Sequence, residues 1–297
     1  MVVSAKLRSA IAWILVCRNR ALGGGLQAQL VDVGPKAEGP VDCKSICDPE
    51  GSPYDRNVEA LQFLKRTWVP DDKNPINLTA VANRRIFFGE GKFSLEYDEE
   101  QEVRNLAIKN PPPNGMVVTV LEMSCVLRCF KKLTGLFIDD SGVQGALQDL
   151  FLPENLVELH MRDCPISGAL TDLGHRSLLG LKLSSSKHQF AITGDLKDLN
   201  VDRLAFLDLR GCRRITGNLA DLKCSTLRGI FLQYTGVSGD ITRLLRDNRR
   251  MTWLDLRGTR VHGSINSEWR QVGQDLIHLR LSDTSVTFNM SEPELVP

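Results

Sequence analysis

The eight cysteines are the first residues of this chain that could carry chemistry, as metal ligands, nucleophiles or disulfide partners. Two pairs have i, i+4 spacing, Cys43/Cys47 and Cys125/Cys129, but neither has the Cys-x-x-Cys spacing or a nearby histidine that is typical of structural zinc. We therefore expect no metal site. Because a chain of this length needs no disulfide scaffold, we interpret the cysteines as free thiols. A Cys43–Cys47 disulfide in an oxidising compartment remains open. The full set is Cys17, Cys43, Cys47, Cys125, Cys129, Cys164, Cys212 and Cys224.

The histidines do not suggest a hydrolytic site, because no carboxylate and nucleophile accompany them at a recurring spacing. They are His160, His175, His188, His262 and His278. The segment from Gly89 to Lys92 is similar to a phosphate-binding loop, but Ile86 replaces its first glycine and Phe93 replaces the required Ser or Thr. The sequence therefore predicts no catalytic residues, no cofactor and a protein that is not an enzyme.

Composition and charge narrow the class of partner. The 297 residues are 42% hydrophobic and 25% charged, which is typical of a soluble globular protein. A net charge of +1, from 37 basic and 36 acidic residues, provides no general attraction to nucleic acid or to an anionic membrane. The apolar run from Ala10 to Cys17 is far shorter than the ~20 residues that cross a bilayer. We expect a protein or peptide partner, bound by a local surface, and no transmembrane span.

The first 53 residues differ in composition from the rest. Residues 1–31 contain no Asp or Glu, and basic residues flank their apolar run, as in a signal or transit peptide. An ordinary amphipathic helix is an equally good interpretation. The segment from Gly34 to Pro53 is rich in glycine and proline, which favours a linker. We expect residues 1–53 to be a targeting segment and flexible linker, with an organellar, secreted or cytoplasmic location left open.

A repeat of 22 to 26 residues organises the chain from residue 133 onward. Its template has apolar residues at offsets 0, 3, 5, 10 and 14 and a glycine at offset 12. Four units match it fully, and three carry an insertion or a substitution; in the last, Phe288 replaces the glycine. The seven units begin at Leu133, Leu156, Leu178, Leu204, Leu227, Met251 and Leu276.

This pattern resembles the leucine-rich repeat family, in its plant-like subtype. The resemblance implies an α/β-type repeat solenoid, with a parallel β-sheet on the concave face and short helical or irregular segments on the convex side. Elementary physics supports the same fold, because an apolar-x-apolar pair buries one face of a strand, and a single coil cannot cover that face alone. The short residue at offset 8 can satisfy buried turn amides, and the glycine lets the backbone bend sharply.

Both ends of the repeat array depart from the template. Val103 begins an eighth, irregular unit thirty residues before Leu133, and Phe288 suggests that residues 276–297 form a C-terminal cap. Upstream, the helical pattern from Asp55 to Trp68 is similar to the N-terminal cap of plant leucine-rich repeats, with strands expected at 85–88 and 93–97. That cap usually carries a disulfide, and residues 61–110 contain no cysteine, which argues against an extracellular receptor. We expect a helical cap over 54–102 and the solenoid over 103–297.

The expected binding residues follow from the stacking. Positions between the strand leucines face away from the core and line up from coil to coil. The central column contains Phe137, His160, Lys182, Asp208, Phe231, Asp255 and Arg280. Exposed aromatic residues beside arginine are typical of interface hot spots. The rival explanation is that Asp208 pairs with Arg210, and Asp255 with Arg257, within the sheet. The predicted partner-binding residues are Phe206, Asp208, Arg210, Phe231, Tyr234, Trp253, Asp255, Arg257 and Arg280.

The function predicted from these features is non-catalytic protein recognition by a rigid curved scaffold. Two alternatives stay open: a plant-type extracellular recognition protein with a cleaved signal, and an accessory structural subunit of an organellar complex. An enzyme that uses the concave face is disfavoured because no acid and base are paired. Ligand identity and oligomeric state are not encoded in any motif.

Overall fold

The computed structural model describes residues 41–76, 78, 84–89, 91–174, 178–186, 191–199, 202–222, 225–266 and 275–289. They all belong to one compact unit, which begins at residue 39. The expected targeting segment lies outside the described residues, as do Cys17, Cys224, His175 and His188.

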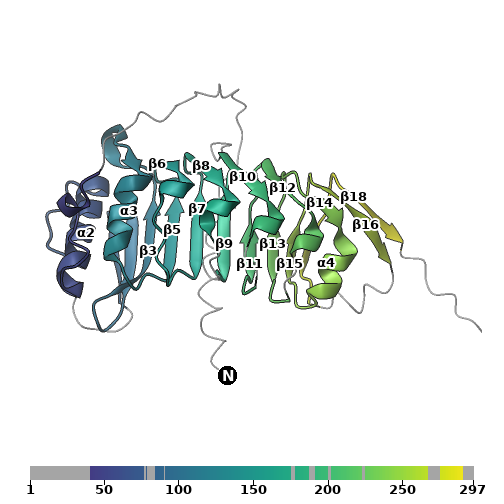
Figure 1. The fold of residues 1–297 in the computed structure, drawn as a ribbon, viewed down its shortest axis with the longest axis horizontal. Helices are drawn as coiled ribbons and strands as arrows, with labels where there is room; N and C mark the ends of the chain where they lie inside the picture. Colours follow the sequence, from purple (N-terminus) through teal and green to yellow (C-terminus); the bar gives the residue numbers. More distant parts are fainter. Residues whose placement is uncertain are drawn as a thin grey trace, which may run out of the picture. The chain divides into compact units, whose positions relative to one another are not determined.

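A ten-stranded sheet runs through this unit, and eight of its strands are parallel and one coil apart (Figure 1). Neighbouring strands pair so that the leucines of successive coils are in direct register, for example Leu136 with Leu159 and Ile230 with Leu254. This register confirms the predicted repeat solenoid with its parallel sheet. The parallel strands are β3 (Val103–Lys109), β5 (Gly135–Asp139), β7 (Glu158–Arg162), β9 (Gly180–Ser184), β11 (Phe206–Asp208), β13 (Gly229–Phe231), β15 (Trp253–Asp255) and β17 (His278–Arg280).

The opposite side of each coil carries a short second strand and, in most coils, one turn of helix. The second strands form a five-stranded sheet, in the order β12-β10-β8-β6-β4, and a three-stranded sheet, β14-β16-β18. They are β4 (Val118–Thr119), β6 (Val143–Ala146), β8 (Ile166–Ala169), β10 (Ala191–Asp195), β12 (Arg214–Thr216), β14 (Ser238–Asp240), β16 (Arg260–Asn266) and β18 (Ser285–Asn289). The helices are η2 (Pro113–Gly115), η3 (Leu147–Asp149), η4 (Leu170–Leu173), η5 (Leu196–Asp198), η6 (Leu219–Asp221) and α4 (Ile241–Asp247).

From β6 to β16, the repeat glycine lies within the second strand or directly after it and has a positive φ. Gly217 has a φ of +119°, and a Cβ placed on it would lie 2.6 Å from the backbone nitrogen of Leu196 in the preceding coil. A side chain is therefore excluded both by the backbone conformation and by the neighbouring coil. The short residues at offset 8 act in two ways. The hydroxyl of Ser141 accepts a hydrogen bond from the Val143 amide at 3.3 Å, as expected. The hydroxyls of Thr235 and Thr259 instead donate to the carbonyl oxygens of Leu232 (2.7 Å) and Leu256 (2.6 Å).

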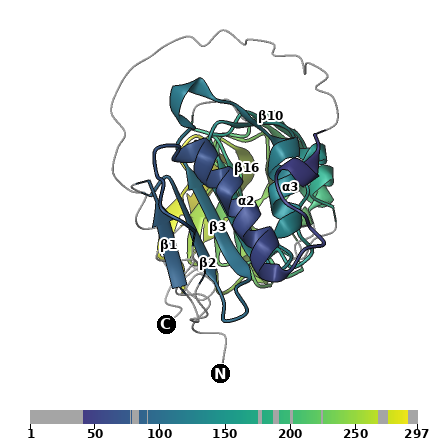
Figure 2. The same cartoon turned by 90° about the vertical axis from the view of Figure 1, so that its left-hand side faces the viewer.

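A helix and an antiparallel hairpin close the N-terminal end of the core (Figure 2). Helix α2 (Pro53–Trp68) begins two residues before the expected Asp55, and its N-cap is Ser52, whose hydroxyl accepts a hydrogen bond from the Asp55 amide. Strands β1 (Arg84–Phe88) and β2 (Phe93–Tyr97) pair with each other and, through β2, with β3. A buried ion pair between Arg56 and Glu102 ties α2 to the start of the first coil. None of the described helices is long and apolar enough to span a bilayer.

The interpretation of all cysteines as free thiols is wrong. Cys43 is bonded to Cys125 and Cys47 to Cys129, so the open possibility of a Cys43–Cys47 bridge is wrong as well. Cys43 and Cys47 lie on the helical turn formed by η1 (Cys43–Ser45) and the residues that follow it. Cys125 and Cys129 lie on α3 (Val120–Cys129), which faces that turn. Among the described cysteines, Cys164 and Cys212 are free and buried.

These disulfides also shift the boundary of the expected linker. Asp42 caps η1 by accepting a hydrogen bond from the Lys44 amide, and Ile46 and Cys47 are buried in the core. Residues 42–53 are therefore part of the folded unit. Helix α3 fills the thirty-residue step between the first two coils, which explains why that step is longer than the others.

The last described coil adds a rung to both sheets. Strand β17 pairs with β15, and β18 pairs with β16. Its apolar residues Leu279 and Val286 are only partly buried, and Phe288 is 60% exposed. Phe288 thus does not cover the core in the way that a cap requires. The rest of the expected cap, residues 290–297, lies outside the described residues.

Candidate functional site

The face of the ten-stranded sheet that points away from the core is called the outer face below. The predicted central column lies on it in the expected order, since each member is the direct strand partner of the next. The column therefore brings Asp208, Phe231, Asp255 and Arg280 onto four successive rungs. Phe206 and Trp253 are two residues before Asp208 and Asp255 and lie on the same face.

Aromatic rings cover the outer face of β11, β13 and β15. The rings of Phe206 and Phe231 both approach Gly229, where an added Cβ would lie 2.8 Å from Cδ1 of Phe206. The centroids of Phe231 and Trp253 are 6.5 Å apart, and Trp253 stacks on His278 of β17 at 3.8 Å. The glycine at position 229 thus lets neighbouring rings lie close to the sheet. The three aromatic residues predicted in this part of the face are brought together, and all are partly exposed.

Each predicted aspartate holds an arginine two residues along the chain. Nε of Arg210 lies 2.9 Å from Oδ1 of Asp208, and NH2 lies 2.5 Å from Oδ2. Arg257 and Asp255 repeat this arrangement at 2.9 Å and 2.7 Å. The rival explanation from the sequence, pairing within the sheet, is therefore what the structure contains. The pairing does not hide the arginines, because the Arg210 and Arg257 side chains remain 41% and 30% exposed.

The aspartates lie beneath the arginines, and the environment of Asp208 keeps that carboxylate ionised. Burial raises the pKa of Asp208, but hydrogen bonds from Arg210 and the charges of Arg210 and Lys182 outweigh it and bring that pKa below its ordinary value. The hydrogen bond from Arg257 to Asp255 raises the pKa of Arg257. Oδ2 of Asp255 also lies 3.8 Å from NH1 of Arg280, so one carboxylate serves two guanidinium groups. The exposed charge on this part of the face is therefore positive.

Tyr234 occupies a backbone position that disfavours it. It has a φ of +63°, and the left-handed region is also occupied at the same place in five other coils, by aspartate or glycine: Asp140, Asp163, Gly211, Gly258 and Asp283. The left-handed conformation lets the Tyr234 amide donate to the Arg257 carbonyl at 2.9 Å, which continues the hydrogen bonding between the two coils beyond the ends of β13 and β15. A bulky residue is costly there. The ring lies over Gly258, 51% of the residue is exposed, and no folding requirement explains the choice of tyrosine.

Three further residues belong to this face but were not among the predicted site residues. His278 stacks on Trp253, and Arg210 lies over Phe231 with Cζ 5.2 Å from the ring centroid. Lys182 lies 3.7 Å from Asp208. Gln233, between Arg210 and Arg257 in the next column, is buried, and its Oε1 has no hydrogen-bond partner among the described residues. The central column predicted from the sequence already contained Lys182, whereas the stacking of His278 and the unpartnered Oε1 of Gln233 needed coordinates.

His160 lies on the same face, nearer the N-terminal end, and is edge-on to Phe137 with centroids 4.8 Å apart. Burial and the charge of Lys182 lower the pKa of His160 to about 4, so its imidazole is neutral at pH 7. Burial also raises the pKa of Glu158, two residues before it. Within the described residues, no group of three or more His, Cys, Asp or Glu side chains is placed to hold a metal ion.

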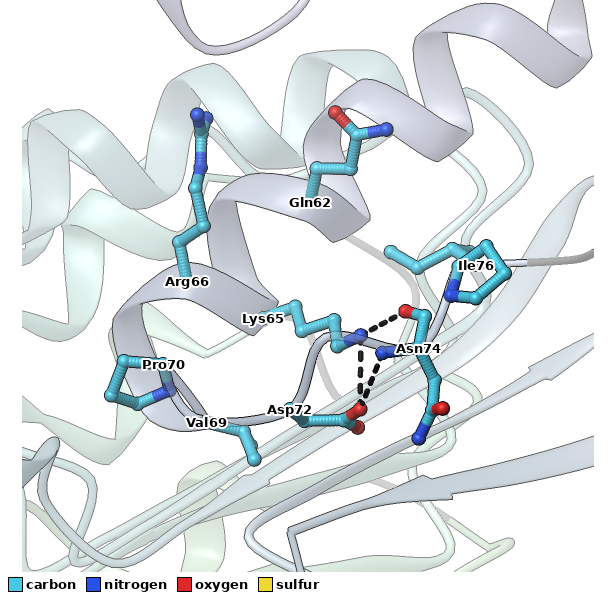
Figure 3. Close-up of a pocket in the computed structure, with 9 residues that line it drawn as sticks. Gln62, Lys65, Arg66, Val69, Pro70, Asp72, Asn74 and Ile76 are labelled. Atoms are coloured by element: carbon cyan, nitrogen blue, oxygen red, sulfur yellow. Dashed lines mark hydrogen bonds and ion pairs between the residues drawn. The ribbon is translucent and has the colours of Figure 1, made fainter.

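A separate pocket of about 200 Å³ lies beside the C-terminal end of α2 (Figure 3). Its buried cation, Lys65, lies 3.2 Å from Asp72 and donates to the carbonyl of Asn74. The Asp72 carboxylate in turn accepts the Asn74 amide at 2.9 Å. The hydrogen bonds and the ion pair among these three residues stabilise the loop after α2. Because its polar groups already have partners within the loop, we assign no ligand to the pocket.

No protein-family model matches the sequence, and no curated protein matches it. Several solved structures share part of the chain path, among them the following three. One is the crystal structure of a plant ice-binding protein, with a TM-score of 0.42 and 14% identity over 81% of this chain and 88% of that one.

The other two are receptor structures. One is the leucine-rich repeat ectodomain of the plant membrane receptor kinase GASSHO1/SCHENGEN3 from Arabidopsis thaliana in complex with Casparian strip integrity factor 2, with a TM-score of 0.42 and 20% identity over 61% of this chain. The other is the plant peptide hormone receptor RGFR1 in complex with RGF2, with a TM-score of 0.28 and 13% identity over 62% of this chain. The chain covers 20% and 40% of their lengths. At these scores, the assignment of a leucine-rich-repeat-like solenoid rests on the strand register described above.

Proposed function

We propose that this protein is a non-enzymatic recognition module that binds a protein or peptide on the outer face of β11 to β17. The observation that carries the proposal is the combination of partly exposed rings with arginines held in place by buried aspartates. Such groups lose little conformational freedom on binding, because their partners within the sheet already fix them. An aromatic cluster of this extent on a solvent-facing sheet calls for a partner that covers it.

The disulfides favour one of the alternatives considered for this recognition role. Disulfides persist in oxidising compartments and are rare in reducing ones. The pairing of Cys43 with Cys125 and of Cys47 with Cys129 therefore supports a protein that acts in an extracellular or other oxidising compartment, as the plant-type extracellular reading proposes. The absence of a cysteine from residues 61–110 no longer argues against it, since this cap is cross-linked through α3 instead.

Affinity capture with matched variants tests the proposed binding face. The test variant is Phe231→Ala, Trp253→Ala, and the control is Phe288→Ala, which removes an exposed ring from β18 on the opposite side of the coil. We expect the partners captured by the wild type to be retained by the control and lost by the double variant, with all three proteins showing the same thermal unfolding. Retention of every specific partner by a folded double variant would exclude this face.

A further inference from the structure

The outer face contains the same six-residue unit twice. Residues 206–211 read Phe-Leu-Asp-Leu-Arg-Gly, and residues 253–258 read Trp-Leu-Asp-Leu-Arg-Gly. Each unit presents an aromatic ring, a buried aspartate and the arginine that this aspartate holds. Each ends in a glycine in the left-handed region, with φ of +77° at Gly211 and +65° at Gly258. The two units are thus copies in conformation as well as in sequence.

The copies are two rungs apart, because β13 lies between β11 and β15. At ~4.8 Å per rung, the equivalent atoms of Arg210 and Arg257 are separated by ~9.6 Å along the sheet. A ligand that makes the same contact with both units must repeat its own chemistry at about this distance. An extended strand repeats every ~6.8 Å on one face, and two turns of α-helix span ~10.8 Å. A polyproline II helix repeats every three residues, or ~9.3 Å, which matches best.

The charge and the unpaired groups indicate what this ligand carries at each repeat. The Nε and NH2 groups of both arginines bind their aspartates, so the NH1 side of each guanidinium is the side that can meet a ligand. A guanidinium binds carboxylates through paired N–H donors. The rings beside both units provide aromatic surfaces of the kind that proline-rich segments contact.

We infer that the outer face of β11, β13 and β15 binds an acidic peptide segment in the polyproline II conformation, with a carboxylate at every third residue. This inference rests on the proposed function and adds the class of ligand. Arg210 and Arg257 bind successive carboxylates, and the rings of Phe206, Phe231 and Trp253 contact the proline rings between them.

Fluorescence anisotropy with three synthetic peptides tests this ligand class. All are acetylated, amidated and labelled: (Pro-Pro-Glu)5, the uncharged (Pro-Pro-Gln)5 and the flexible (Gly-Ser-Glu)5, measured at one near-physiological salt concentration. We expect the full chain to bind (Pro-Pro-Glu)5 at least ~10-fold more tightly than either control peptide, because only that peptide combines conformation with charge. Arg210→Gln and Arg257→Gln should each weaken binding at least ~5-fold. Arg243→Gln, an exposed arginine on α4, should leave it unchanged.

Each contrary result overturns a defined part of the inference. Equal binding of (Gly-Ser-Glu)5 would exclude the polyproline II conformation, and equal binding of (Pro-Pro-Gln)5 would exclude carboxylate recognition. Binding that Arg243→Gln weakens as much as Arg210→Gln would indicate general charge attraction. Binding of none of the peptides would reject the ligand class, whereas the proposed face itself is tested separately, by the capture experiment with Phe231→Ala, Trp253→Ala.

Discussion

The carboxylate of Asp255 binds Arg257 through both Nε, at 2.9 Å, and NH2, at 2.7 Å, while Asp255 itself is only 5% exposed. A buried carboxylate that holds a partly exposed guanidinium makes the arginine rigid without hiding it. The same relationship between Asp208 and Arg210 makes this a repeated feature of the sheet and not an isolated ion pair.

Removing one of these carboxylate charges should destabilise the fold. Asp255→Asn leaves Arg257 and Arg280 without their shared anion in a partly buried setting, and we expect the free energy of unfolding to fall by roughly 1–3 kcal/mol. The control is Asp247→Asn, which breaks the exposed ion pair with Arg243 on α4 and should change stability by less than ~0.5 kcal/mol. Urea unfolding of both variants measures this, and equal effects would contradict the account.

His160 should make stability depend on pH in a defined window. Its pKa is about 4 in the folded protein, whereas in the unfolded chain the imidazole has its ordinary pKa of 6.5. The stability from neutral His160 is therefore fully present above pH 6.5 and is lost as the pH falls toward 4, by roughly 3 kcal/mol. The wild type should lose this much more stability between pH 7 and 4 than His160→Gln does.

The groups that face His160 are Glu158, Lys182 and Asp208, and all are retained in His160→Gln, so they cancel in the comparison. An NMR titration of the imidazole provides an independent check. Parallel pH profiles for the two proteins, or an imidazole that titrates near pH 6.5 in the folded state, would contradict the burial of this side chain.

The two disulfides should be cooperative in their effect on stability. Either one alone closes the long loop between η1 and α3, so removing a single bridge opens only a short additional ring and should cost roughly 3 kcal/mol. Removing both opens the 82-residue loop as well and should cost roughly 7 kcal/mol, more than the sum of the single losses. Thermal unfolding of Cys43→Ser, Cys125→Ser, of Cys47→Ser, Cys129→Ser and of the fourfold variant measures this.

Peptide mapping of the non-reduced protein checks the pairing itself. Fragments that link Cys43 to Cys125 and Cys47 to Cys129 are expected. A Cys43–Cys47 bridge, or free thiols at all four positions, would contradict the structure.

Tyr234 should show a conflict between stability and binding. Asparagine tolerates the left-handed conformation better than tyrosine, so Tyr234→Asn should raise the free energy of unfolding by up to ~1 kcal/mol. The same substitution removes an exposed ring from the proposed face and should weaken capture of the partner. A variant that is less stable than the wild type, or one that binds equally well, would remove the functional interpretation of this residue.

The spacing of apolar residues was sufficient to predict which side chains share the outer face. Because a strand alternates strictly and the coils stack in register, Phe231 and Asp255 had to be neighbours. The repeat pattern could not predict the disulfides, because Cys43 and Cys125 are 82 residues apart and meet only where α3 is inserted between the first two coils. The i, i+4 spacing of both cysteine pairs was the available signal, because it places two thiols on one face of a helical turn, but we interpreted the pairs as free thiols.

The left-handed column was not predicted either. Aspartate or glycine occurs at five of its positions, which is the composition that such a conformation favours, but the repeat template contained no apolar residue there to draw attention to it. Tyr234 stands out only when its backbone conformation is known. The pairing of Asp208 with Arg210 was correctly foreseen as a rival to binding, and the structure makes it a means of orienting the arginine.

Site-specific photo-crosslinking is the most direct measurement of the claim that the outer face binds a partner. A photoreactive benzoylphenylalanine replaces Phe231 in one protein and Phe288 in another, and each is irradiated in the native source material. The account predicts a discrete cross-linked adduct from position 231 and none from position 288. Both positions carry aromatic residues on opposite sides of the coil, Phe231 partly exposed and Phe288 exposed. No adduct at 231, or the same adduct at both positions, would contradict it.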